Sequence, residues 1–426
     1  MILRALSVRG ALLISPFLLA LTPAAQAAGD TPAHWTAAWA TALQPIPALS
    51  APPPLYQTPD VAGRTVRQIV YPTLSGQAVR IHLSNAYGKA PLVIADLRIA
   101  RSAGGAGVDP RSEAQVRFGG KAAVTVPPGG ELDSDPVTLE VTAGAPYAIS
   151  STMGREQKMV AWHRVSSQTN YVSAPGDHAA DPSGEAFRER FTHYAWVTAV
   201  SVSVEAPSAL AIAAVGDSIT DGMRSSLNEN RRWPDALARR IGQTGDRSVG
   251  VINLGISGNR LLNDSPCYGD ALERRFDRDV LQHPGVRAAV LLVGINDINF
   301  SAMPAHGGLD CDAPHTVVSA ADLIAGYQRV ISDAHRRGVR IFGATLTPAS
   351  LPPTREAVRA TVNQWIRTSR GFDGVVDFDA ALRDPSDPDR LQRGLDSGDH
   401  VHPSDAGYAA MAAAVPVDAI VNAARK

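Results

Sequence analysis

The sequence predicts an α/β three-layer domain with a mostly parallel sheet, preceded by an antiparallel β-sandwich or jelly-roll domain. Two observations carry this prediction. The first half of the chain alternates apolar and polar residues between frequent turns, whereas the second half repeats short apolar runs and amphipathic helices. The pattern changes near residue 209, so we expect the two domains to span residues 30–208 and 209–426. A chain of 426 residues is long enough for both.

The start of the chain has the pattern of a secretory signal peptide. Two arginines precede or border an apolar run at residues 11–21, which is too short to span a bilayer. The Ala-Gln-Ala sequence at residues 25–27 provides the small residues of a cleavage site. We therefore expect residues 1–27 to be removed near Ala27. The mature protein would be periplasmic or secreted and would lack an integral membrane segment. An uncleaved signal anchor is the alternative.

The composition excludes nucleic acid as an expected partner. The formal net charge is -1, and the sequence contains no run of Lys and Arg that would bind phosphates. Hydrophobic residues make up 45% of the chain and charged residues 19%, which is typical of a globular protein. The sequence does not indicate an oligomeric state.

Short antiparallel strands are expected throughout the first domain. Alternation of apolar and polar residues is clearest at 79–84, 97–99, 124–126, 137–141 and 200–204, with turn residues between these segments. Many short strands at such spacing are typical of a sandwich or jelly roll. The large aromatic residues of this domain either form a platform for sugar rings or, more commonly, fill a core; they are Trp35, Trp39, Tyr71, Tyr87, Trp162 and Trp196. His163 either faces the active site or is simply buried.

Strands and helices alternate in the second domain. The expected strands are apolar on both faces, as in a parallel sheet covered by helices, and they span 211–215, 249–254, 288–293, 340–345 and 375–378. Between them, residues at helical spacing predict a helix that begins at Pro234 and two others at 320–337 and 352–368.

Polar motifs follow the first three of these strands, and a fourth motif lies near the C-terminus. They are Gly-Asp-Ser-Ile at 216–219, Asn-Leu-Gly-Ile-Ser-Gly-Asn at 253–259, Gly-Ile-Asn-Asp at 294–297 and Asp-His-Val-His-Pro at 399–403. The carboxyl ends of parallel strands meet at one edge of a sheet, so Ser218, Gly258 and Asn296 can share a crevice. Asp217 and Ser218 are also good helix caps, and a cap without catalytic function is the alternative for the first motif taken alone.

These residue types suit acyl transfer. A serine hydroxyl such as that of Ser218 needs a base, which His402 can supply. The imidazole needs an acceptor that holds its tautomer, and Asp399 lies three residues earlier. A tetrahedral oxyanion needs donors already in position, and the N–H groups of Ser218 and Gly258 with the amide of Asn296 provide three.

In this order and at these strand ends, the four motifs resemble the conserved blocks of the SGNH (GDSL-type) esterase superfamily. The resemblance extends from about residue 210 to the C-terminus, with Ile219 where the family often has Leu. It implies a flavodoxin-like three-layer fold and a serine ester hydrolase that works through an acyl-enzyme without a metal or organic cofactor. Carried over by position, it assigns Ser218 as nucleophile and oxyanion donor, Gly258 and Asn296 as the other donors, His402 as base and Asp399 as its acid.

Other polar residues of the motifs have supporting interpretations. Asp217, Asp297 and Asn259 are expected to hold the loops by hydrogen bonds. Asp396 is a rival acid by residue type, but its distance along the chain from His402 does not match the motif. His400 is more simply a loop residue.

The order of the domains suggests a substrate. A β-sandwich before such a domain resembles certain two-domain carbohydrate deacetylases, which implies a small-molecule or carbohydrate ester and favours an acetyl group. The alternatives are a lipid esterase such as a lysophospholipase or arylesterase, an acyltransferase that uses the same triad, and a non-catalytic carbohydrate-binding protein.

Cys267 and Cys311 are the two cysteines of the chain. In an exported protein they are most simply a disulfide, and a metal site is the less expected alternative, because neither has a second Cys nearby. Such a bond would tie together the loops that follow the second and third strands of the parallel sheet and would shape a wall of the substrate site.

Overall fold

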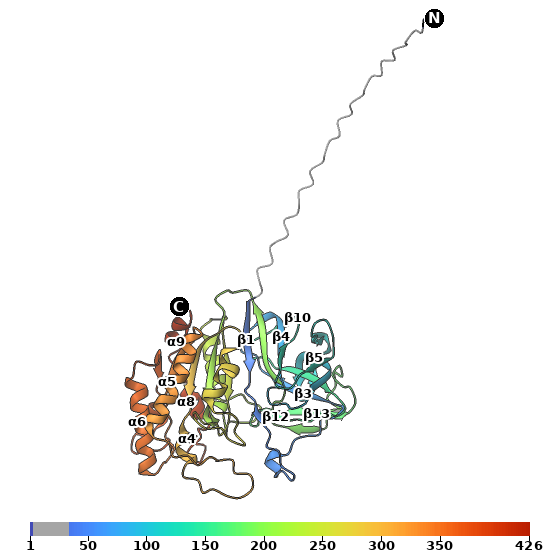
Figure 1. Cartoon of the computed structure of the whole chain (residues 1–426). Helices are drawn as coiled ribbons and strands as arrows, with labels where there is room; N and C mark the ends of the chain where they lie inside the picture. Colours follow the sequence, from blue (N-terminus) through green and yellow to red (C-terminus); the bar gives the residue numbers. More distant parts are fainter. Residues whose placement is uncertain (3–33) are drawn as a thin grey trace. The chain divides into compact units, whose positions relative to one another are not determined.

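The computed structural model describes residues 1–2 and 34–426. The predicted signal peptide, apart from its first two residues, and its cleavage position lie outside the described residues. His34–Lys426 form one compact unit. Figure 1 shows a β-rich part, coloured blue to green, and an α/β part, coloured yellow to red.

The β-rich part contains fifteen strands among residues 34–204. They are β1 (His34–Ala40), β2 (Gln44–Pro45), β3 (Arg64–Val70), β4 (Gly76–Ser84), β5 (Leu92–Gly104), β6 (Gly107–Val108), β7 (Ala114–Gln115), β8 (Val124–Val126), β9 (Glu131–Asp133), β10 (Val137–Val141), β11 (Tyr147–Met153), β12 (Ala161–Trp162), β13 (Asn170–Pro175), β14 (Glu189–Phe191) and β15 (Val197–Val204). Two short 3-10 helices, η1 (Pro54–Tyr56) and η2 (Pro110–Ser112), interrupt them.

These strands form two larger antiparallel sheets. One has the order β1-β15-β4-β10, with β9 beside β4, and the other has the order β14-β13-β3-β11-β5-β6, with β7 and β8 beside β5. Residues of both sheets meet in one hydrophobic cluster that includes Trp39, Trp162 and Trp196, so these three aromatic residues fill a core. The expected β-rich first part is confirmed, and its finer description as a sandwich or jelly roll stays a prediction.

The α/β part is built on five parallel strands, which confirms the predicted sheet. They are β16 (Leu210–Gly216), β17 (Val249–Gly255), β18 (Val286–Leu292), β19 (Arg340–Ala344) and β20 (Gly374–Val376), and the sheet order is β17-β16-β18-β19-β20. The helical elements are α1 (Ser218–Asp221), α2 (Trp233–Gln243), α3 (Leu272–Phe276), the π-helical turn η3 (Asp277–Leu281), α4 (Ile295–Phe300), α5 (Ala320–Arg336), α6 (Pro353–Thr368), α7 (Phe378–Leu382), α8 (Asp405–Ala414) and α9 (Val417–Ala424).

Local sequence signals explain where these helices begin. Ser319 and Asp322 form a reciprocal capping box at the start of α5. Expected boundaries differ by one or two residues in places: the strand predicted at 288–293 spans Val286–Leu292. The strand predicted at 375–378 ends at Val376, because the Asp377 side chain accepts a hydrogen bond from Ala380 N–H and starts α7.

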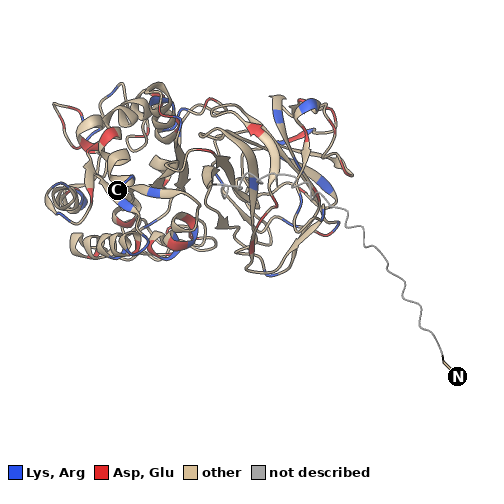
Figure 2. Ribbon diagram, turned by 90° about the horizontal axis from the view of Figure 1, so that it is seen from above, with Lys and Arg blue, Asp and Glu red and all other residues tan. Residues whose placement is uncertain are grey.

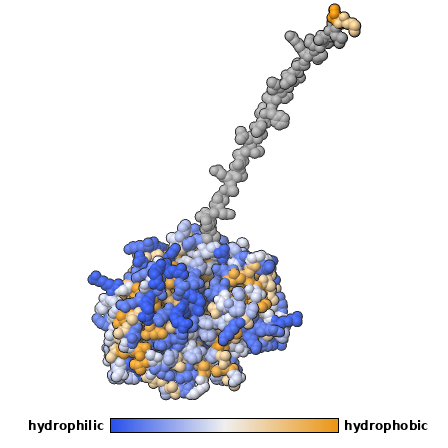
Figure 3. Space-filling model, viewed as in Figure 1, coloured by the Kyte–Doolittle hydropathy of each residue, from blue (hydrophilic) through white to orange (hydrophobic). Residues whose placement is uncertain are grey.

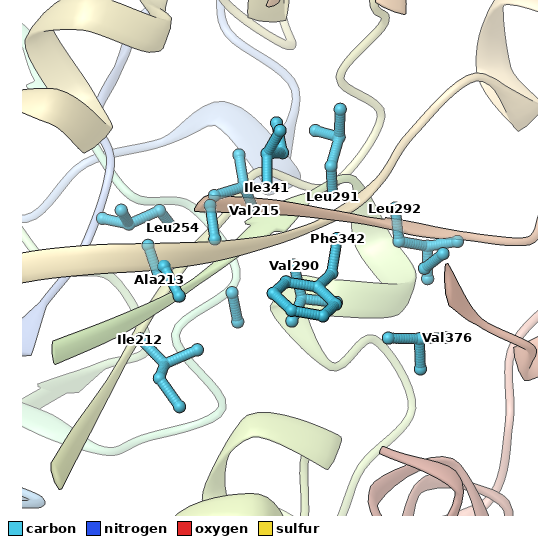
Figure 4. Packing of buried hydrophobic residues seen from close by; sticks show 14 of the residues in the cluster. Ile212, Ala213, Val215, Leu254, Val290, Leu291, Leu292, Ile341, Phe342 and Val376 are labelled. Carbon is cyan, nitrogen blue, oxygen red and sulfur yellow. The ribbon is translucent and has the colours of Figure 1, made fainter. Parts of the chain in front are cut away.

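The parallel sheet reverses its strand order between β16 and β18, which are neighbours although β17 separates them in the chain. Figure 4 shows how side chains of adjacent strands, such as Ile212, Val290 and Phe342, gather in the core of this part. In an open α/β sheet, ligands bind beyond the carboxyl ends of the strands at such a reversal. The loops after β16, β17 and β18 therefore lie where a ligand site is expected.

Hydrogen bonds join the β-rich part to the edge strand β17. The hydroxyl oxygen of Thr73 lies 2.9 and 2.8 Å from the carbonyl oxygens of Ala38 and Val251, to either of which it can donate its one hydrogen, and it accepts the Val251 N–H at 2.9 Å. The backbone groups of this sheet edge are therefore partly satisfied by the β-rich part.

Charged residues of both signs are interspersed over the described chain (Figure 2), and the face seen in Figure 3 mixes hydrophilic residues with small hydrophobic areas. Among the described residues, no single helix is long and apolar enough to cross a membrane. Helices α8 and α9 meet that test of length and composition only as a pair, with a 55° bend between them.

Candidate active site

Ser218 lies at the turn between β16 and α1. Asp217 caps the helix by accepting the Ile219 N–H at 3.1 Å, and Gly222 ends it after one turn with a φ of 96°. Gly216 is required at the strand end, because a Cβ there would lie 2.0 Å from the carbonyl oxygen of Leu292. The tight turn presents Ser218 beyond the carboxyl end of the strand.

The structure brings Ser218, His402 and Asp399 together. Ser218 Oγ lies 2.8 Å from His402 Nε2, and His402 Nδ1 lies 2.9 Å from Asp399 Oδ2. Ser218 and His402 are 184 positions apart in the chain. Because both ring nitrogens are engaged, a ring that donates from Nδ1 to the carboxylate presents Nε2 to the hydroxyl as an acceptor.

Asp399 is held as a carboxylate by several donors. Its Oδ1 accepts the N–H groups of Val401 and His402, at 3.1 and 2.8 Å, and its Oδ2 accepts from Arg224 Nε at 3.1 Å. Partial burial acts to raise the pKa of this carboxyl, but the hydrogen bonds from the His402 backbone and ring outweigh it and hold the pKa well below its usual range. Asp399 therefore carries its negative charge beside His402.

Asp396 and His400 form a separate pair. Asp396 Oδ2 lies 2.7 Å from His400 Nδ1, and the His400 side chain is exposed. The structure thus pairs each aspartate of this loop with a different histidine.

Gly258 and Asn296 lie on the loops that follow β17 and β18. Gly258 has a φ of 83°, and a Cβ there would meet the ring of Tyr268 at 2.4 Å, so both backbone geometry and space require glycine. The Asn296 side chain donates one N–H to the carbonyl of Asn259 at 2.9 Å. An amide nitrogen has two hydrogens, so this bond fixes the group and leaves its second donor.

A buried hydrogen-bond network holds these loops in place. The Asn259 amide donates to the carbonyls of Tyr268 and Asp270, at 2.9 and 2.8 Å, and its oxygen accepts from Arg275 Nε at 3.0 Å. Arg275, which is only 1% exposed, also donates to the carbonyls of Leu254 and Gly216. One guanidinium therefore ties the carboxyl end of β16 to the end of β17 and to the loop that follows it.

Asp297, which follows β18, fixes the segment after Gly258 by hydrogen bonds. Its carboxylate accepts the N–H groups of Leu261 and Leu262, at 2.7 and 3.0 Å. Burial nevertheless raises the pKa of Asp297 to about 6, because desolvation outweighs these bonds. Burial also raises the pKa of Asp217 to about 7, and its Oδ2 makes no hydrogen bond to a described residue.

The raised pKa of Asp217 predicts a pH-dependent cost in stability. A folded-state pKa above the unfolded value stabilises the fold at low pH, and this contribution is lost as the pH rises through about 7. Relative to Asp217→Asn, the wild type should lose stability between pH 4 and pH 7, by at most about 1.4 kcal/mol per pH unit. Denaturant unfolding of both proteins across this range measures the difference, and a constant difference would contradict the prediction.

Comparison with known proteins identifies the region that carries these residues. Residues 214–410 match the sequence profile of the GDSL-like Lipase/Acylhydrolase family. This region is a GDSL-like lipase/acylhydrolase domain. The resemblance drawn from the four motifs is thereby confirmed, and so is the expected enzyme class, a carboxylic ester hydrolase.

Solved structures similar to the chain include other proteins of this kind. A G-D-S-L family protein from Desulfitobacterium hafniense is 21% identical with a TM-score of 0.36, covering 50% of this chain and 98% of that one. A GDSL-like lipase from Bacteroides thetaiotaomicron is 17% identical with a TM-score of 0.34, covering 49% and 87%. A catalytic mutant of an acetylxylan esterase from Geobacillus stearothermophilus is 21% identical with a TM-score of 0.36, covering 50% and 94%. No curated protein matches the chain.

The GDSL-like domain contains the expected disulfide between Cys267 and Cys311, whose Cα atoms are 5.1 Å apart. Tyr268, the residue after Cys267, lies with its ring against Gly258 and 5.5 Å from the ring of Phe300. The Tyr56 hydroxyl, from the β-rich part, lies 3.1 Å from Cys311 Sγ. The disulfide thus contacts Tyr56 of the β-rich part through Cys311. Through Cys267 it is bonded in sequence to Tyr268, whose ring packs against Gly258.

Removal of this disulfide should affect both stability and selectivity. It closes a loop with a sequence separation of 44, for which the loop-entropy estimate is about 4 kcal/mol. We expect reduction or a Cys267→Ser/Cys311→Ser variant to lower the free energy of unfolding by up to that amount. The variant should also change relative turnover among esters of different acyl length, because Tyr268 loses its support. Identical relative turnover for every acyl length would exclude this role.

Three residues near the GDSL-like site were not singled out from the sequence. Arg224 contacts Asp399, Arg275 joins the ends of β16 and β17, and Asp221 binds the Gly258 loop. Their partners lie far away in the chain or are backbone carbonyls, so residue type and spacing gave no signal. Within residues 34–426, no three His, Cys, Asp or Glu side chains are grouped so that they could hold a metal ion.

Proposed function

We propose that the chain is an exported serine ester hydrolase that works through an acyl-enzyme on short acyl esters, favouring acetyl esters of carbohydrates. The observation that carries the chemical part is the continuous hydrogen-bonded path from Ser218 through His402 to Asp399, with steps of 2.8 and 2.9 Å. Export rests on the sequence of residues 1–27 alone.

In the proposed mechanism, Ser218 Oγ attacks the ester carbonyl while His402 Nε2 takes the hydroxyl proton. His402 then gives this proton to the leaving alkoxide, and the acyl group remains on Ser218. A water molecule attacks the acyl-enzyme in the same way, with His402 again as base, and releases the acid. The charged Asp399 stabilises the imidazolium that forms in each half of the reaction.

The oxyanion would be bound by the N–H groups of Ser218 and Gly258 and by the free amide hydrogen of Asn296. In support, neither of these N–H groups makes a hydrogen bond to any residue that the structure describes. Donors that are already oriented toward the developing charge need no reorganisation during the reaction.

Replacement of Asn296 tests this assignment. We expect Asn296→Ala to lower kcat by about 10²–10³-fold, the usual effect of losing one oxyanion donor. Ser218 should still react with an organophosphate, because its hydroxyl and base are intact. Asn299→Ala on the same helix, where Asn299 contacts Arg355, is the matched control and should keep kcat close to the wild-type value. An unreactive Ser218 in Asn296→Ala would show that the donor is misassigned.

The proposed preference for carbohydrate esters rests on the order of the domains, and side chains of the β-rich part lie near the Gly258 loop. The Arg164 guanidinium lies 5.6 Å from the ring centre of Tyr56 and 6.0 Å from that of Tyr268. Tyr56 and Arg164 are themselves buried, so they support Tyr268 beside the Gly258 loop. A lipid esterase would be expected to have an extended apolar trough.

A turnover profile tests the substrate class. We expect kcat/KM to be highest for acetyl esters, to fall as the acyl chain lengthens, and to be higher for acetylated sugars than for aryl acetates. A rise with acyl length would favour the lipid esterase, and more transfer than hydrolysis with added alcohols would favour the acyltransferase. Activity that is equal in wild type and Ser218→Ala would exclude the proposed chemistry and favour a binding protein.

A further inference from the structure

We infer that His163 of the β-rich part is a positioning residue for ester hydrolysis, because it holds Asp221, which in turn holds the Ser257-Gly258 loop. This inference rests on the proposed function, in which the Gly258 N–H binds the oxyanion. It gives the β-rich part a role in the reaction itself and not only in binding substrate.

The contacts form an unbroken path from the β-rich part to the loop. His163 Nε2 lies 2.9 Å from Asp221 Oδ1, and both side chains are at least 95% buried. The other oxygen of Asp221 accepts the Ser257 N–H at 2.9 Å and the Ser257 hydroxyl at 2.6 Å. Ser257 directly precedes Gly258, so the carboxylate fixes the backbone that orients the candidate oxyanion donor.

Asp221 also belongs to α1, the single helical turn that begins at Ser218. A second bond between the same elements runs from the Asn253 amide to the carbonyl of Thr220, at 2.9 Å. Gly255 packs so closely on this turn that a Cβ would lie 2.3 Å from Asp221 N. The nucleophile turn and the donor loop are therefore fixed to each other, with the Asp221 carboxylate at their junction.

The surroundings of His163 explain why a histidine is needed. Nδ1 lies 3.1 Å from the carbonyl oxygen of Ala42, and Nε2 lies 3.1 Å from that of Val165 as well as beside Asp221. Each of these neighbours is an oxygen that can accept a hydrogen bond, so a ring nitrogen that carries a hydrogen finds an acceptor on either side of the ring. A buried carboxylate is costly without such compensation.

Without the imidazole beside its Oδ1, the Asp221 carboxylate would keep its bonds to Ser257 but would lose the side chain that packs against its other oxygen. If the carboxylate shifts, the Ser257-Gly258 loop that is hydrogen-bonded to it shifts as well. An oxyanion donor is effective only when it lies about 2.7–3.1 Å from the developing charge, so a small shift reduces kcat. Substrate binding in the ground state depends less on this alignment, and KM should change little.

Two substitutions separate positioning from simple packing. In His163→Gln the amide nitrogen reaches the place of Nε2 and can still lie beside Asp221 Oδ1, whereas in His163→Asn it reaches only the place of Nδ1. We expect His163→Asn to lower kcat by about 10–100-fold, a part of the effect of losing a whole donor. His163→Gln should recover most of this loss. His82→Gln is the matched control in the β-rich part, since His82 pairs with Asp133 at 2.8 Å and has no contact with α1, and it should leave kcat unchanged.

A double-mutant cycle provides the decisive measurement. If His163 acts through Asp221, then His163→Asn should cause no further loss of kcat in an Asp221→Asn background. Equal losses from His163→Asn in both backgrounds, or equal kcat values for His163→Asn and His163→Gln, would overturn the inference. Thermal unfolding of each variant identifies folded protein. Should His163→Asn not fold, Ser257→Ala replaces it in the cycle with Asp221→Asn, and additive losses there would equally overturn the inference.

The Ser218→Ala variant separates this inference from the function on which it rests. An inactive Ser218→Ala protein together with wild-type kcat for His163→Asn would remove only the positioning role. An active Ser218→Ala protein would remove the proposed function as well.

Discussion

Replacement of Ser218 by alanine should lower kcat by about 10⁴–10⁶-fold, because the proposed acyl-enzyme cannot form without its hydroxyl. His402→Ala should cause a loss of the same size, since it removes the base that lies 2.8 Å from Ser218 Oγ. Hydrolysis of p-nitrophenyl acetate measures both, with the spontaneous rate subtracted.

The combination of the two substitutions is more informative than either alone. Residues that act as one unit are strongly non-additive, so the double variant should be hardly slower than each single variant. Multiplied losses in the double variant would show that Ser218 and His402 contribute separately, which would contradict the proposed mechanism.

Asp399→Asn should lower kcat by about 10⁴-fold, because an amide in place of the carboxylate no longer fixes the tautomer of His402 or stabilises its charged form. The nearby Asp396→Asn is a matched control, since Asp396 pairs with His400 at 2.7 Å and not with His402. A loss of kcat in Asp396→Asn comparable to that in Asp399→Asn would mean that the acid has been assigned to the wrong pair.

Much of the α/β part could be predicted because local sequence determines it. The five strands are apolar runs that need both faces covered, and the helices between them carry their own start signals, as at Ser319 and Asp322. Parallel strands then force the motifs after β16, β17 and β18 onto one sheet edge. The juxtaposition of Ser218 with the loops of Gly258 and Asn296 follows from topology, without knowledge of any contact.

The supporting contacts could not be predicted in the same way. Arg275 binds carbonyl groups, which every residue has, so nothing in the sequence indicates its partners Gly216 and Leu254. His163 and Asp221 lie 58 positions apart and in different parts of the fold, and each is an ordinary buried polar residue when considered alone. The sequence left His163 with two interpretations, and the structure agrees with the buried one: the ring is 4% exposed and lies beside Asp221.

The hydrogen bonds of Thr73 to Ala38 and Val251 have a consequence for attempts to study the second half of the chain separately. Strand β17 is the outermost strand of its sheet, and a free strand edge readily pairs with another polypeptide. A protein shortened to residues 209–426 would lose Thr73 and expose this edge. We therefore expect such a fragment to aggregate as it folds, even though it retains all the motif residues.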